Sequence, residues 1–172
     1  MVGNSATSGE TDCHAFLFGR NGMTDLGTLG GSFSIAFAIN DEGQVVGESS
    51  TSGDNSTPHA FLHEGNGMHD LGTLGGSFSR ALGINNAGQI VGVSPNYPGG
   101  RIRAFLYSDG VMTDLNSLSA VKVAGWFLDT ANAINSAGQI IGSGVRGGQT
   151  HAYLLSPKYE RGQHGGDQRH IP

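Results

Sequence analysis

Histidine and aspartate recur together along the chain, and an imidazole beside a carboxylate can act as an acid–base pair or as a fixed hydrogen bond. The two residues lie 11 positions apart, and arginine takes the place of histidine once. The pairs are His14 with Asp25, His59 with Asp70, and Arg103 with Asp114. A carboxylate accepts from either partner, and a residue that recurs in every repeat is usually structural. We therefore predict hydrogen bonds between strands, because a catalytic pair is expected to occur once.

Three other kinds of chemistry have little support in the sequence. His59, His63 and His69 could bind a metal, but they flank a strand and no cysteine pair accompanies them, which favours solvated surface histidines. The segment GTLGGS lacks the Lys-Ser/Thr ending of a phosphate loop, and no GxSxG nucleophile turn occurs. We predict no catalytic residue, no metal and no cofactor.

Two aromatic residues are candidate ligand contacts. Trp126 is the single tryptophan, and its segment GWFL replaces the GGSFS of other repeats, so it could form a platform for a sugar ring. The favoured alternative is that Trp126 packs in the core, in the space that the lost GGS leaves. Tyr97 belongs to the variable segment SPNYPGGRIR.

These residues sit within a unit that is written a little under four times. HAFL begins at His14 and His59, RAFL at Arg103 and HAYL at His151, at spacings of 45, 44 and 48 residues. A second marker has the form IN-x-x-GQ-[VI]-[VI]-G. Its repeated asparagines and glycines are Asn40, Asn85, Asn135, Gly43, Gly88 and Gly138. Each pair suits a tight turn in which the glycine adopts a positive φ.

Each unit predicts four short antiparallel strands. In residues 35–74 the apolar runs IAFAIN, QVVGES, HAFLH and MHDLGTL are separated by NDEGQ, a loop rich in Ser and Thr, and EGNG. About 45 residues and four strands are typical of a β-propeller blade, whereas β-solenoid coils are shorter. We predict an all-β, propeller-like fold of three to four blades, incomplete in this chain, and no helix.

The unit boundaries follow from the same markers. Residues 1–157 form the repeat domain, with a partial unit 1–34, full units 35–79 and 80–128, and a partial unit 129–157. Counting three, four, four and three strands gives 14. Residues 158–172 have almost no apolar side chains and predict a disordered polar tail. Met1 stands where Val45 stands in the next unit, so the chain is expected to be the C-terminal portion of a longer repeat protein.

Composition narrows the partners. The chain has 9 basic and 14 acidic residues and a net charge of −5, which disfavours nucleic acid. No apolar run is long enough for a membrane span, and no signal peptide precedes residue 1. Cys13 is the single cysteine, so no internal disulfide can form.

The markers HAFL, DLGTLGG and IN-x-x-GQ-[VI]-[VI]-G, recurring in one order over residues 1–157, resemble the bacterial HAF repeat family of probable extracellular proteins. The resemblance implies an extracellular or cell-surface location and carries over no catalytic residues. Arg103 in place of histidine and the altered segment after Asp114 depart from the family pattern.

We therefore expect a non-catalytic repeat module for binding or scaffolding, with a surface glycan or a protein as ligand. The variable loops between second and third strands are its expected contact surface. One alternative is a structural fragment that self-associates through open strand edges. A glycosidase-like propeller is a weaker alternative, because it needs a pair of acidic residues outside the repeated set.

Overall fold

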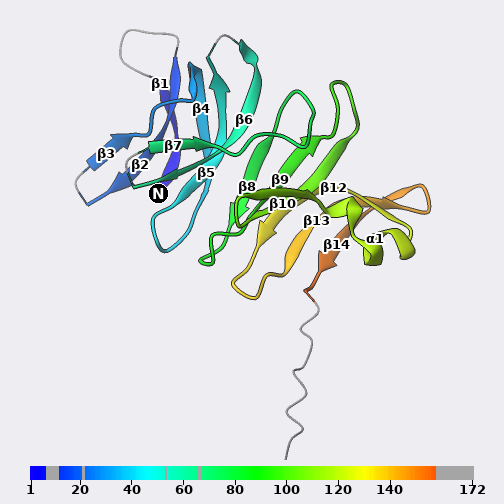
Figure 1. Ribbon diagram of the computed structural model, residues 1–172. Coiled ribbons are helices and arrows are strands. Elements are labelled where there is room, and N and C mark those ends of the chain that lie inside the picture. Colours follow the sequence, from blue (N-terminus) through cyan, green and yellow to red (C-terminus); the bar gives the residue numbers. More distant parts are fainter. Residues whose placement is uncertain (7–11, 21, 53, 66, 158–172) are drawn as a thin grey trace, which may run out of the picture.

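The computed structural model describes residues 1–6, 12–20, 22–52, 54–65 and 67–157. These residues form 14 strands, and most strand pairs are antiparallel (Figure 1). The prediction of an all-β fold is confirmed, and in the described part of the chain no sheet closes on itself. The predicted tail, residues 158–172, lies outside the described residues.

The strands fall into four groups in chain order. The first group contains β1 (Val2–Ala6), β2 (Cys13–Gly19) and β3 (Gly22–Asp25), with β2 in the middle. The second group contains β4 (Gly30–Ile39), β5 (Val45–Thr51), β6 (Asp54–Glu64) and β7 (Gly67–Asp70), each paired with the next. A single parallel pair, Cys13 with Phe33, joins β2 to β4.

The third and fourth groups repeat this pattern. The third contains β8 (Arg80–Ile84), β9 (Ile90–Pro95), β10 (Ile102–Ser108) and β11 (Val111–Asp114). The fourth contains β12 (Trp126–Ile134), β13 (Ile140–Arg146) and β14 (Gln149–Leu155). The strands β4 and β12 extend across the unit boundaries drawn at residues 35 and 129.

A glycine in the second strand of a group lets its aromatic neighbour and first strand approach closely. A Cβ at Gly47 would lie 1.9 Å from the Ile35 carbonyl oxygen and 2.8 Å from the Phe61 ring. Gly92 has the same surroundings, with the Arg80 carbonyl oxygen at 1.9 Å and the Phe105 ring at 2.9 Å. The sequence VVG or IVG followed by AFL therefore specifies one packing arrangement.

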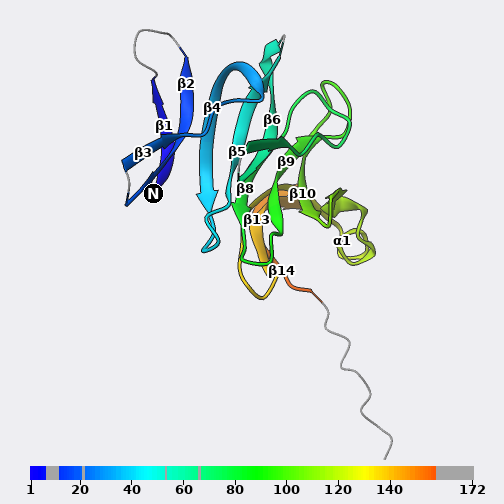
Figure 2. The same cartoon turned by 60° about the vertical axis from the view of Figure 1, so that its left-hand side comes forward.

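Apolar side chains lie between neighbouring groups and form three core clusters. One joins the first and second groups through Ala15, Leu26, Val45 and Phe61. The other clusters lie between the second and third groups and between the third and fourth. The four groups follow one another across the molecule, with the first and the fourth at opposite ends (Figures 1 and 2).

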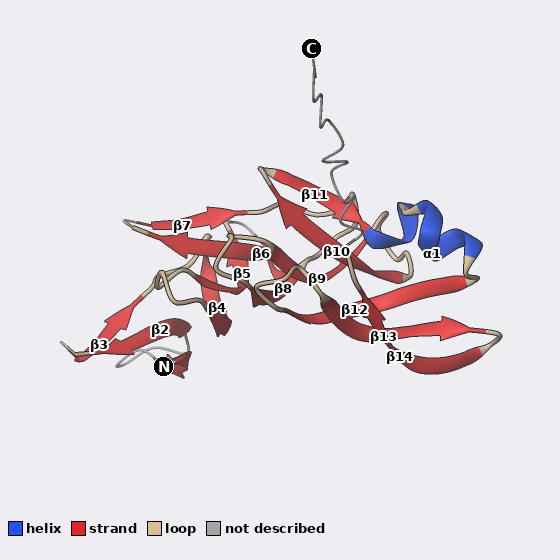
Figure 3. Cartoon of the chain, turned by 90° about the horizontal axis from the view of Figure 1, so that it is seen from below, coloured by secondary structure: helices blue, strands red, loops and turns tan. Residues whose placement is uncertain are grey.

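The expectation of no helix is wrong at one place. A 3₁₀ turn, η1 (Leu115–Ser117), and a short helix, α1 (Ser119–Val123), precede β12, as the view in Figure 3 shows. This stretch has lost the glycines of GTLGGS and contains Ala120, Val121 and Lys122, so a helical turn is no longer interrupted. Val121 is buried beneath it. Among the described residues, no helix has the length and apolar character needed to span a membrane.

Candidate functional site

Each His/Arg–Asp pair is in direct contact. The shortest distance from the His14 Nδ1 or His59 Nδ1 to its aspartate Oδ2 is 2.8 Å, and the Arg103 Nη1 lies 2.8 Å from the Asp114 Oδ2. The cationic or imidazole partner comes from the third strand of a group, or from β2 in the first group, and the aspartate ends the following strand. The spacing of 11 residues thus spans one hairpin.

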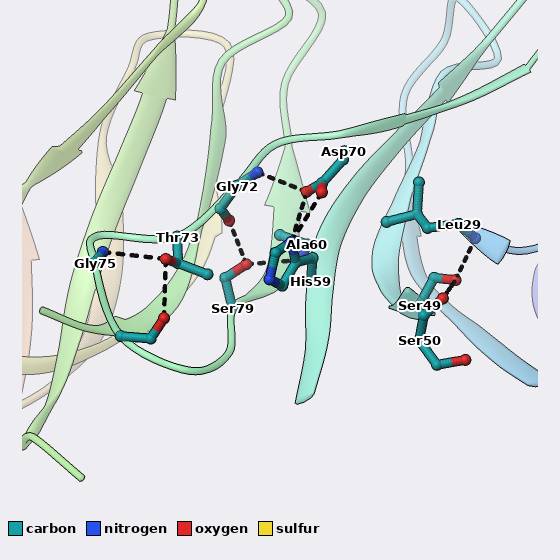
Figure 4. A network of polar contacts seen from close by, with 11 residues as sticks. Leu29, Ser49, Ser50, His59, Ala60, Asp70, Gly72, Thr73, Gly75 and Ser79 are labelled. Carbon is teal, nitrogen blue, oxygen red and sulfur yellow. Dashed lines mark hydrogen bonds and ion pairs between the residues drawn. The ribbon is translucent and has the colours of Figure 1, made fainter. Parts of the chain in front are cut away.

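The same aspartates also cap the turn that follows. The Asp25 Oδ1 accepts from the Gly27 amide at 2.8 Å, and the Asp70 Oδ1 accepts from the Gly72 amide at 2.7 Å (Figure 4). Burial raises the pKa of Asp25, but the Gly27 hydrogen bond, the His14 hydrogen bond and the His14 charge together lower it below its usual value. These carboxylates therefore favour the ionised state that holds two hydrogen-bond donors.

A catalytic triad would need a hydroxyl on the other imidazole nitrogen. Ser5 pairs with His14 in the β1–β2 register, but its Oγ donates to the Ala6 carbonyl oxygen at 3.4 Å. Ser49, at the same position of the second group, is buried and donates to the Phe33 carbonyl oxygen. These serine hydroxyls bond to backbone instead of activating a nucleophile.

Buried serines of the GGSFS segment join one strand group to the next. The Ser79 Oγ accepts from the Ala60 amide at 2.7 Å and donates to the Gly72 carbonyl oxygen at 2.5 Å (Figure 4). Ser34 makes the equivalent bonds to the Ala15 amide and the Gly27 carbonyl oxygen. Each hydroxyl satisfies one donor and one acceptor that are otherwise buried at a junction.

A second serine receives the amide of the same linker. The Leu29 amide donates to the Ser49 Oγ at 2.8 Å, and the Leu74 amide donates to the Ser94 Oγ at 3.0 Å. Thr73 closes the loop between them by donating to the Gly76 carbonyl oxygen (Figure 4). The polar residues of GTLGGSFS thus bind backbone groups and leave no phosphate cradle.

The third junction uses a different side chain for the same purpose. The Asn116 Nδ2 donates to the Leu128 carbonyl oxygen at 2.9 Å, and its Oδ1 accepts from the Leu128 amide at 2.7 Å. Asn116 is buried, and its own amide is held by the Asp114 Oδ1. An asparagine therefore replaces the serine bridge where the glycine-rich segment is lost.

The repeated asparagines form a chain from group to group. Asn40, Asn85 and Asn135 each accept from the amide four residues later, and Gly43, Gly88 and Gly138 adopt the expected positive φ. The Asn40 Nδ2 donates to the Asn85 carbonyl oxygen at 3.1 Å, and the Asn85 Nδ2 donates to the Asn135 carbonyl oxygen at 3.0 Å. Besides shaping a turn, Asn40 and Asn85 therefore each bind the next turn.

One buried charge is paired across a junction. Glu48 is buried on β5, and its Oε2 accepts from the Arg80 Nε at 2.5 Å. A buried carboxylate without a partner is costly, so Arg80 stabilises the contact between the second and third groups. This pair occurs once, and the repeat analysis did not predict it.

The remaining histidines do not gather into a metal site. In the described residues, no three His, Cys, Asp or Glu side chains converge. Burial, and also the charge of His69, lower the pKa of His63, although the backbone hydrogen bond of His63 opposes them. A neutral His63 is therefore favoured in the folded chain.

Trp126 is half-buried beside other aromatic groups. Its ring meets His151 edge-on at 6.0 Å and Tyr153 at 6.3 Å between centroids, and it packs against the core between the third and fourth groups. Burial raises the pKa of Tyr153, whose hydroxyl donates to the Thr130 carbonyl oxygen. This packing supports the expectation that Trp126 occupies core space.

An arginine–aromatic cluster lies where the β9–β10 loop meets β12. The Arg101 guanidinium is 3.8 Å from the Phe127 ring centroid and forms two hydrogen bonds to Asp129. Arg103 lies over the same ring at 5.1 Å. Tyr97, in the same loop, is exposed, as is Arg101. Tyr97 and Trp126 are not in a printed ring contact with each other.

A cavity of about 570 Å³ lies between the third and fourth groups. Leu106, Leu115, Leu118, Ile134 and Ile140 contribute apolar lining, and Ser119 and Gln89 contribute polar atoms. It adjoins η1 and α1, so it occurs where the repeat pattern changes.

Comparison with protein-family models, with curated proteins and with solved structures finds no match to this chain. Its chemistry therefore has to be inferred from the contacts described above.

Sequence reasoning missed the bridging side chains Ser34, Ser79, Ser49, Ser94 and Asn116. A signal was present for the serines, because GGSFS and VGES or VGVS recur at one spacing. Asn116 had no such signal, because it belongs to the degraded segment DLNSLS.

Proposed function

We propose that the chain is a non-catalytic repeat module that binds a glycan through the loop end of its third and fourth strand groups. One observation carries this proposal. The repeated polar residues hold backbone groups and each other, whereas the exposed Tyr97 and Arg101 project from a loop that differs between repeats. An aromatic face beside charge-assisted hydrogen-bond donors suits a sugar ring with several hydroxyls.

We further propose a propeller-like arrangement of the four groups and an extracellular or cell-surface location. The repeated junction contacts support the first part. Resemblance to the HAF repeat family supports the second. Protease treatment of intact cells tests the location, because a surface protein is cleaved and an internal one is protected.

Binding is tested on a glycan array with purified chain, followed by titration of any hit. Tyr97→Ala is expected to weaken binding by about fivefold or more, the usual loss at a central contact residue. Val111→Ala is the matched control, since Val111 is exposed at the opposite end of the β10 strand. Equal binding by both variants would contradict the proposed loop site.

A protein ligand at the same loops is the second candidate, because Arg101 and Tyr97 are residue types common at protein interfaces. A wild-type chain that binds no glycan but whose protein partner is lost with Tyr97→Ala would favour it.

A further inference from the structure

The two faces of each internal strand group are buried against different neighbours. On one face, Val46 and Val91 are buried and lie opposite Leu62 and Leu106 in the strand register. Val46 and Leu62 pack with residues of the third group, and Val91 and Leu106 pack with residues of the fourth. This outgoing face is therefore covered by the group that follows.

The fourth group carries the same pair with nothing over it. Ile141 lies opposite Leu154 in the β13–β14 register, as Val91 lies opposite Leu106. Ile141 is 51% exposed and Leu154 is 63% exposed. The outgoing face of the fourth group is thus an apolar surface of the kind that is buried at every other junction.

The first group shows the opposite half. At the incoming face, Val45, Ile90 and Ile140 are buried against the preceding group. Met1 stands at the corresponding position, bonded to the Phe18 backbone, and is 74% exposed. Phe18 is 49% exposed and faces Met23, at 60%, in the β2–β3 register.

We propose that a second copy of this chain docks head to tail, with the outgoing face of its fourth group on the incoming face of the first. The two open faces are the two halves of a junction that the chain already forms three times. They lie at opposite ends of the molecule, so one chain does not join them itself (Figures 1 and 2). A second copy supplies the missing half of each.

This association is heterologous, because different surfaces of the two copies meet. Each copy keeps one open face, so further copies add until a ring closes or a filament grows. The inference concerns sheet faces and goes beyond the proposed loop binding. Tyr97→Ala is expected to leave assembly unchanged, and substitutions at the faces are expected to leave glycan binding per chain unchanged, so failure of one proposal is distinguishable from failure of the other.

The test uses the full chain and two complementary variants. Ile141→Asp blocks the outgoing face, and Phe18→Asp blocks the incoming face. Val123→Asp is the control, since Val123 is strongly exposed on α1 and belongs to neither face. Leu154→Asp and Met23→Asp repeat the two changes at neighbouring exposed positions. Circular dichroism of each variant establishes that it is folded.

Light scattering over a dilution series from micromolar to submillimolar protein gives the mass. The wild type and Val123→Asp are expected to exceed the 17.7 kDa of one chain as concentration rises. Each blocked variant alone is expected to stay at the single-chain mass. An equimolar mixture of Ile141→Asp and Phe18→Asp is expected to give one species of twice that mass, because one intact face of each kind remains.

Three results would overturn the inference. A wild type that stays at the single-chain mass at all concentrations would show that the faces are covered within the chain or need no partner. Assembly of Ile141→Asp that equals the wild type would show that other surfaces meet. A mixture of the two blocked variants that remains monomeric would exclude the head-to-tail contact.

Discussion

Ser79 shows why a residue of modest chemistry recurs at fixed spacing. Its buried hydroxyl is the shared partner of an amide in one strand group and a carbonyl in the following linker. An unpaired buried amide costs about 1–3 kcal/mol. Alanine cannot accept or donate, so the position tolerates little besides a small hydroxyl.

Ser79→Ala is therefore expected to lower the free energy of unfolding by about 2 kcal/mol, because the Ala60 amide loses its acceptor. Urea unfolding followed by tryptophan fluorescence measures the change. Ser117→Ala is the matched control, since Ser117 is exposed on η1, and a surface change of this kind is expected within about 0.5 kcal/mol. Coincident unfolding curves for wild type and Ser79→Ala would refute the bridging role.

The His–Asp contacts are the residue-level feature that the sequence predicts most directly. A spacing of 11 residues fits a hairpin, and substitution by arginine indicates a donor. The Glu48–Arg80 pair could not be found this way, because it occurs once and its members are 32 residues apart. Repetition made local contacts readable, whereas a single long-range contact left no pattern.

At the scale of elements, the central constraint is close packing across each second strand. A side chain at Gly92 has no room, because the first-strand backbone and the Phe105 ring both lie against its Cα. Backbone atoms cannot move aside as a flexible side chain can. This accounts for glycine between two β-branched residues and the next strand segment.

Gly92→Ala is expected to destabilise the fold by about 2–3 kcal/mol, in the range for overpacked sites. Thermal unfolding by differential scanning calorimetry measures the effect. Gly67→Ala serves as the comparison, since a Cβ at Gly67 meets nothing within 4 Å. If both variants melt together, the close approach at Gly92 carries no energetic weight.

The elements also show where sequence reasoning ends. Strand pairs and Asn–Gly turns follow from local residue types, and the 14 strands match the predicted number. The helix α1 and the 570 Å³ cavity beside it arise where the glycine-rich pattern degenerates. There the backbone follows the packing of Val121 and Leu128 in one core cluster, which no periodicity announces.

At the scale of the whole molecule, the junctions decide how the chain holds together. Between successive groups, a buried amide or side chain of one group binds the next, through Ser34, Ser79 and Asn116. The apolar clusters lie at the same junctions. Stability is therefore expected to depend on nearest neighbours, as in other serial arrays.

Hydrogen exchange of the Ala15, Ala60 and Leu128 amides tests this claim most directly. These amides donate to side chains across the three junctions, outside the backbone ladders. The account predicts exchange slowed on the order of a thousandfold or more relative to an unfolded chain, as for interior strand amides. NMR or peptide-level mass spectrometry gives the rates. Exchange of the three amides at unfolded-chain rates, while neighbouring strand amides remain protected, would contradict it.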